Sequence, residues 1–174
     1  GEDPEHQHPL AERGHLCVDC PKDARSPIRL CMVEAVVDTS VIVKWYSVHQ
    51  EPEFERAQTL LVAHTRQQCH LHLPALAFYE AGNALCYSPR LSVQAQLRSL
   101  ADLFALGLSV HPLGLARAVA SHEVASLFGV SFYDACFVAL AQELDVAFIT
   151  ADERLHHRIA SLPFAHTLAS YRLP

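Results

Sequence analysis

The 174-residue chain has no long apolar run, no excess of basic charge and no regular spacing of cysteines. No segment reaches the roughly 18 consecutive apolar residues of a membrane-spanning helix, so we expect no membrane contact. The first residues are polar and rich in His and Pro, which argues against a secretory signal peptide. The six cysteines are scattered, which favours free, mostly buried thiols over a disulfide framework. These absences predict a cytoplasmic location.

Acidic residues outnumber basic ones, with 19 Asp and Glu against 13 Lys and Arg and a net charge of −6. The chain therefore lacks the strongly basic character of a high-affinity nucleic-acid binder. This argues only weakly against a nucleic-acid partner, because bound divalent cations reverse the local charge of an acidic site. Hydrophobic residues make up 51% of the chain and charged residues 18%. This balance excludes a disordered polyampholyte and supplies the core of one domain.

The composition of the chain changes near residue 31. Residues 1–31 hold four Pro and three His and show no periodic apolar face, and Met32 is the only methionine. We expect residues 1–31 to be a flexible or non-native extension, and residues 32–174 to form one domain.

The N-terminal segment also invites a zinc interpretation. His15, Cys17 and Cys20 are closely spaced, and Cys31 follows. A zinc ribbon normally supplies two well-spaced ligand pairs, and here the second pair is incomplete. Zinc is therefore the less favoured interpretation.

Strand-like and helix-like segments alternate from residue 33 onward. Apolar runs predict strands at 33–37, 70–73, 109–111, 146–149 and 165–168. Helical spacing of apolar residues predicts helices at 53–67, 75–87, 91–106, 114–128, 132–144 and 152–160. This alternation is typical of a parallel sheet covered by helices on both faces, a three-layer α/β fold.

Four acidic residues stand where a carboxylate is costly to place. Asp38 and Asp152 follow apolar strand-like runs, whereas Glu80 and Asp134 lie in nearly uncharged helical segments. Parallel strands end at one edge of a sheet, and the apolar neighbours of Glu80 and Asp134 indicate that both face the core. Two like charges about 4 Å apart repel by roughly 4 kcal/mol at an effective dielectric of about 20. Four convergent carboxylates therefore predict a hard cation, Mg²⁺ or Mn²⁺, of the kind that activates water for attack on phosphorus.

Each acid also has a simpler interpretation. Asp38 and Asp152 could cap the helices that follow them, a common role for Asp. Glu80 and Asp134 could be protonated, hydrogen-bonded core acids. The joint arrangement of the four is more specific than any one of them.

The segments VVDTSVIVKW, FYEAGNAL and SFYDACFVALAQELDVAFITADERL, in this order, resemble PIN-domain proteins, especially the VapC-type toxins of bacterial toxin–antitoxin systems. The resemblance covers residues 32–172 and implies a five-stranded parallel sheet between helices. It also implies a Mg²⁺- or Mn²⁺-dependent endoribonuclease whose catalytic and metal-binding acids are Asp38, Glu80, Asp134 and Asp152. Residues 1–31 and the long spacing from Asp38 to Glu80 depart from the family pattern, but neither departure touches the acids.

Neighbouring polar residues fit the same site. In family members, hydroxyls like those of Thr39, Ser40 and Thr150 orient the acids or metal-bound waters, although Thr39 and Ser40 could equally be helix caps. Asn83 lies one helical turn from Glu80 and either supports it or packs as an ordinary amide.

The resemblance further implies three partners: an RNA substrate, an inhibitory antitoxin protein and a second copy of the chain in a homodimer. Apolar residues of the first helices could contact the antitoxin or could belong to the core; they are Trp45, Tyr46, Phe54, Leu60 and Leu61.

Two other functions compete with the nuclease. A catalytically silent scaffold of the same fold would bind RNA or a protein partner, but it has no reason to keep all four acids. A phosphatase of the haloacid dehalogenase type also begins with an Asp after a strand. It would need a second Asp two residues later, where Ser40 stands.

Overall fold

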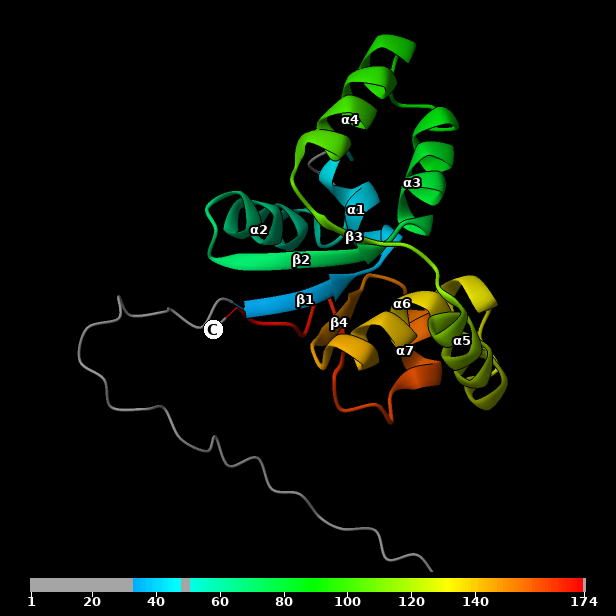
Figure 1. The fold of residues 1–174 in the computed structure, drawn as a ribbon. Coiled ribbons are helices and arrows are strands. Elements are labelled where there is room, and N and C mark those ends of the chain that lie inside the picture. The colour runs from blue at the N-terminus through cyan, green and yellow to red at the C-terminus, as the bar shows by residue number, and fades with distance from the viewer. Residues whose placement is uncertain (1–32, 48–50, 174) are drawn as a thin grey trace, which may run out of the picture. The chain divides into compact units, whose positions relative to one another are not determined.

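The computed structural model describes residues 33–47 and 51–173, and Figure 1 shows their arrangement. The predicted extension, residues 1–31, lies outside these described residues. The zinc interpretation also falls outside them, because its candidate ligands are His15, Cys17, Cys20 and Cys31.

The described residues form five strands and seven helices. The strands are β1 (Val33–Val37), β2 (Cys69–Pro74), β3 (Ser109–His111), β4 (Ala147–Thr150) and β5 (Ala165–Thr167). The helices are α1 (Thr39–Trp45), α2 (Phe54–Thr65), α3 (Leu76–Cys86), α4 (Val93–Ala105), α5 (Leu115–Phe128), α6 (Phe132–Leu144) and α7 (Glu153–Ile159).

All strand pairs in the sheet are parallel, in the order β3-β2-β1-β4-β5. The predicted α/β fold with a five-stranded parallel sheet between helices is thus confirmed. The centre of the sheet is β1, where Val36 lies opposite His72 of β2 and Phe148 of β4. Val36, Val37 and Phe148 are fully buried, as expected for central strands covered on both faces.

The chain reverses its direction across the sheet between β1 and β4. From β1 it proceeds outward to β2 and β3, and it then returns to β4 on the other side of β1. Because such crossovers are right-handed, α1–α4 cover one face and α5–α7 the other, and Figure 1 shows the two groups apart. The carboxyl ends of β1 and β4 flank this switch point, where open α/β sheets bind their ligands.

Most predicted elements agree with the structure to within two residues. Helix α1 is absent from the helices that apolar spacing predicts. Helix α5 ends at Gly129, which adopts a left-handed conformation with φ of 63°.

Burial answers two open questions from the sequence. Trp45 and Leu60 are buried, so they belong to the core and do not form an exposed contact surface. Of the described cysteines, Cys69 and Cys136 are buried free thiols, whereas Cys86 is exposed, contrary to the expected packing. Among the described residues no single helix is long and apolar enough to cross a membrane; only α5 and α6 together pass that test, with a bend of 114° between them.

Candidate active site

Asp38 lies at the carboxyl end of β1 and is almost completely buried, with 6% of its surface exposed. Two hydroxyls donate to its Oδ2 atom, from Ser40 at 2.5 Å and from Thr150 at 2.6 Å. Its backbone N–H also donates to the carbonyl of Ile149 in β4. Asp38 begins α1 but makes no side-chain cap, so the capping interpretation does not describe its carboxylate.

Glu80 approaches from helix α3 and is half-buried. The hydroxyl of Thr39 donates to its Oε2 atom at 2.6 Å, although the two residues are 41 positions apart in the chain. Thr39 therefore joins the first turn of α1 to Glu80. Asn83, the other residue predicted to support Glu80, is exposed on the next turn of α3.

Asp134 lies in the first turn of α6 and is also half-buried. Ser131 donates its hydroxyl to Asp134 Oδ2 at 2.7 Å and accepts the backbone N–H of Asp134 at 3.0 Å. Sequence reasoning missed Ser131. A signal was present, because a Ser followed three residues later by an acid is a capping-box pattern, here SFYD.

Asp152 is exposed and caps helix α7. Its Oδ1 atom accepts the backbone N–H groups of Arg154 at 2.8 Å and Leu155 at 3.1 Å. Its own N–H donates to the hydroxyl of Thr150, which in turn donates to Asp38. The capping interpretation thus describes one oxygen of Asp152, while Thr150 connects its backbone to the buried acid.

Three of the four predicted acids interact electrostatically. Burial raises the pKa of Asp38 above 3.8, and the charge of Asp134 adds to this rise, while the hydroxyls of Ser40 and Thr150 oppose it. Burial also raises the pKa of Glu80, as do the charges of Asp38 and Asp134, against the hydrogen bond from Thr39. The site thus brings carboxylates from β1, α3 and α6 into mutual repulsion at the switch point.

The sequence that forms this site also matches a known protein family. A model of the PIN domain matches residues 35–161. The chain belongs to the PIN domain family.

Solved structures share the fold of this PIN domain. A protein from Pyrobaculum aerophilum is 22% identical with a TM-score of 0.59, covering 80% of this chain and 93% of that chain. A toxin–antitoxin complex from Klebsiella pneumoniae is 18% identical with a TM-score of 0.57, and the match covers 77% of this chain and 97% of that chain. VapC20 from Mycobacterium tuberculosis, a toxin that cleaves the sarcin–ricin loop, is 15% identical with a TM-score of 0.55. The match covers 71% of this chain and 93% of that chain. No curated protein matches the sequence.

The donors of this PIN domain fit a hard divalent cation in their chemistry. Asp38, Glu80 and Asp134 offer carboxylate oxygens, and within the described residues none of the three forms an ion pair with Lys or Arg. No three His, Cys, Asp or Glu side chains in the described part of the chain lie close enough to hold one ion. Magnesium accepts such a site, because it is usually held by one or two carboxylates and completes its shell with waters and substrate phosphates.

An open hollow of about 650 Å³ is lined by Asp152 and by the hydroxyl residues that hold Asp38 and Glu80. Thr39, Ser40 and Asp152 line it together with two cations, Lys44 and Arg154. Two further acids, Glu51 and Glu153, also line the hollow, so its charges are mixed. Arg154 lies beside Asp152 in this lining and is able to contact a phosphate.

We predict that Asp38→Asn stabilises the metal-free PIN domain at neutral pH. The folded-state pKa of Asp38 is raised, so the protonated carboxyl favours the folded state. This contribution to the free energy of unfolding is complete below pH 3.8, the ordinary pKa of Asp, and is lost as the pH rises through the folded-state pKa. The neutral amide avoids this loss, and its oxygen can still accept both hydroxyls. Denaturant unfolding in EDTA should give the variant the higher free energy of unfolding near pH 7, and the difference should shrink on acidification.

Glu123→Gln, an exposed acid of α5, is the control for this prediction and should change stability little at either pH. A variant that is less stable than the wild type at neutral pH would contradict the account of Asp38.

Proposed function

We propose that this PIN domain is a cytoplasmic, metal-dependent endoribonuclease and the toxin of a toxin–antitoxin pair. The observation that carries the proposal is the convergence of Asp38, Glu80 and Asp134, without a cationic partner among the described residues, at the topological switch point. Similar solved structures include a toxin–antitoxin complex and a toxin named for cleaving the sarcin–ricin loop, which supports the same class of activity.

In this proposal Asp38, Glu80, Asp134 and Asp152 hold Mg²⁺ or Mn²⁺, directly or through water. When bound, the ion would lower the pKa of a coordinated water and stabilise the charge that develops on phosphorus oxygens. The chain's own hydroxyls fix the ligands before substrate arrives, since Ser40 and Thr150 hold Asp38, Thr39 holds Glu80 and Ser131 holds Asp134.

The same proposal assigns the rim of the hollow to the RNA backbone. Arg154 lines the hollow beside Asp152, where a phosphate group would contact it. Lys44 lines the hollow as well, but its Nζ atom donates to the carbonyl of Pro52 at 2.9 Å. Arg158, the other arginine of α7, donates instead to the carbonyl of Gly129 and does not line the hollow. Arg154 is therefore the arginine of this helix that we assign to substrate.

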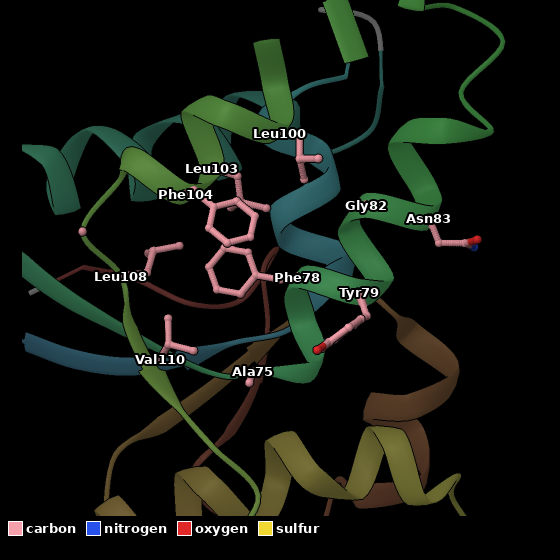
Figure 2. Close-up of a pocket in the computed structure, with 11 residues that line it drawn as sticks. Ala75, Phe78, Tyr79, Gly82, Asn83, Leu100, Leu103, Phe104, Leu108 and Val110 are labelled. Atoms are coloured by element: carbon pink, nitrogen blue, oxygen red, sulfur yellow. The ribbon is translucent and has the colours of Figure 1, made fainter. Parts of the chain in front are cut away.

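For the antitoxin we propose the groove between α3 and α4 as the docking surface. Figure 2 shows this groove, where the rings of Phe78 and Phe104 pack with centroids 4.3 Å apart. It encloses about 650 Å³, and no charged residue lines it. An apolar segment of a partner protein suits such a groove, and similar solved structures contain toxin–antitoxin complexes. We also propose that two copies of the chain form a homodimer.

We predict that the purified protein cleaves RNA in the presence of Mg²⁺ or Mn²⁺ and that EDTA abolishes this cleavage. Asp38→Asn and Asp134→Asn should each lower the cleavage rate by at least about 100-fold, since even outer-shell changes at metal sites cost about 10- to 100-fold. Gel analysis of several RNAs measures this. Asp145→Asn, an exposed acid at the end of α6, should cleave like the wild type.

Metal-dependent cleavage that survives both substitutions would contradict the assignment of the acids. Failure to cleave any RNA, together with failure to bind metal, would favour the alternative function, a silent PIN scaffold that binds RNA or a protein.

A second prediction separates the two roles of Asp152. Asn caps a helix as well as Asp does, so Asp152→Asn should leave stability within about 0.5 kcal/mol, whereas Asp152→Ala should cost about 1 kcal/mol. If Asp152 also serves the metal, Asp152→Asn should lower cleavage about tenfold or more. Thermal unfolding and initial cleavage rates, measured on both variants, test this. Wild-type cleavage by Asp152→Asn would reduce Asp152 to a helix cap.

A further inference from the structure

A second, smaller pocket adjoins the groove of Figure 2, with which it shares Ala75 and Tyr79. Its volume is about 240 Å³, below the roughly 300–1,000 Å³ of pockets that enclose drug-sized ligands. Its walls come from the ends of β2 and β3 and from α3, α5 and α6. Three aromatic residues, Tyr79, Phe132 and Tyr133, line it. This space suits one planar ring system and not a helix.

The position of the aromatic walls relates the pocket to the reaction. Tyr79 directly precedes Glu80, and Tyr133 directly precedes Asp134. The two tyrosines come from different helices and line the same pocket. Successive residues of a helix point in different directions, so this adjacency in sequence does not by itself bring the acids to the pocket. Cys136 does connect the two, because it lines the pocket and interacts electrostatically with Glu80.

Both tyrosines are unusually exposed for such large side chains, Tyr79 at 76% and Tyr133 at 60%. Figure 2 shows Tyr79 extending from α3 towards Ala75, and these two residues line both the groove and the small pocket. Exposed rings beside an apolar recess offer stacking surfaces, the means by which proteins hold unpaired bases.

The polar groups of the pocket leave it without a free charge. Arg117 donates to Glu143 through Nε at 2.7 Å and Nη2 at 2.8 Å, and to the carbonyl of Pro112 at 2.7 Å. His111 lies 3.1 Å from His72, ring nitrogen to ring nitrogen, and burial lowers its pKa. No carboxylate lines the pocket. A neutral ligand fits these walls better than a phosphate or a carboxylate does.

We propose that this pocket, the base pocket, holds one unpaired nucleobase adjacent to the phosphodiester that is cut. The proposal rests on the nuclease function and deepens it, because it assigns a binding site for one base of the substrate to the residues of this pocket. A base within a continuous duplex faces inward and cannot enter such a pocket without being extruded. Tyr79 and Tyr133 are the residues that we assign to stacking on the extruded or unpaired base.

The test uses a short single-stranded oligoribonucleotide in which 2-aminopurine replaces a base, and the same strand annealed to its complement. In an Asp38→Asn background with Mg²⁺, which prevents cleavage, the single strand should lose 2-aminopurine fluorescence on binding, while the duplex should not. Tyr79→Ala and Tyr133→Ala should each weaken binding about tenfold, the size expected for one lost stacking contact, and reduce the quenching.

Two variants control for the ring itself. Tyr79→Phe keeps the stacking surface and should retain binding and quenching. Tyr87→Ala removes a tyrosine that is 80% exposed at the end of α3 but lines neither the base pocket nor the groove, and it should bind like the parent.

The outcomes separate the base pocket from the nuclease function. Cleavage by the wild type that Tyr79→Ala and Tyr133→Ala leave unchanged would overturn the base pocket and keep the nuclease. If 2-aminopurine quenching depends on the two tyrosines but the wild type never cleaves RNA, the base pocket is supported and the nuclease function is contradicted. Equal quenching by single strand and duplex, or none with either, would overturn the base pocket and leave the recess to a protein partner.

Discussion

The electrostatic cost of placing Asp38 in the core is the constraint on which the rest of the site depends. A carboxylate that is 6% exposed loses most of its hydration, and the charge of Asp134 raises its pKa further. Two hydroxyls that donate to one oxygen offset only part of this cost. A protein retains such an arrangement when a ligand compensates for it, and a divalent cation held by one or two of these carboxylates and by water or substrate oxygens would do so.

The topology of the sheet explains why this cost falls at one place. Asp38 directly follows β1, Thr150 ends β4, and the chain turns in opposite directions from these two adjacent strands. The crevice at their carboxyl ends is then walled by helices from both faces, and α3 brings Glu80 while α6 brings Asp134. The fold thus collects acids from distant parts of the chain without strained backbone at any of them.

Much of this could be predicted from the sequence, because the signals are local. An apolar run that ends in Asp38 indicates a buried strand with an acid at its end, and helical spacing around Glu80 and Asp134 indicates which side they face. The contacts that hold the acids could not be assigned, since Thr39 meets Glu80 across 41 positions and Thr150 meets Asp38 across 112. Such pairings depend on how the elements pack, which periodicity does not specify.

Surface features were predicted least well, for the same reason. Exposure of an apolar side chain depends on whether another element covers it, and the first helices illustrate this, because Trp45 is buried while Tyr79 of α3 is open. The base pocket is assembled from five separate elements, so no single segment carries its pattern.

The central claim is that the acids are a metal site, and titration calorimetry of metal-free protein with Mn²⁺ tests it most directly. The account predicts that the wild type binds Mn²⁺ and that Asp38→Asn binds far more weakly, because the variant lacks the buried carboxylate whose charge the ion would compensate. Equal binding by the two proteins, or no binding by the wild type, would contradict it.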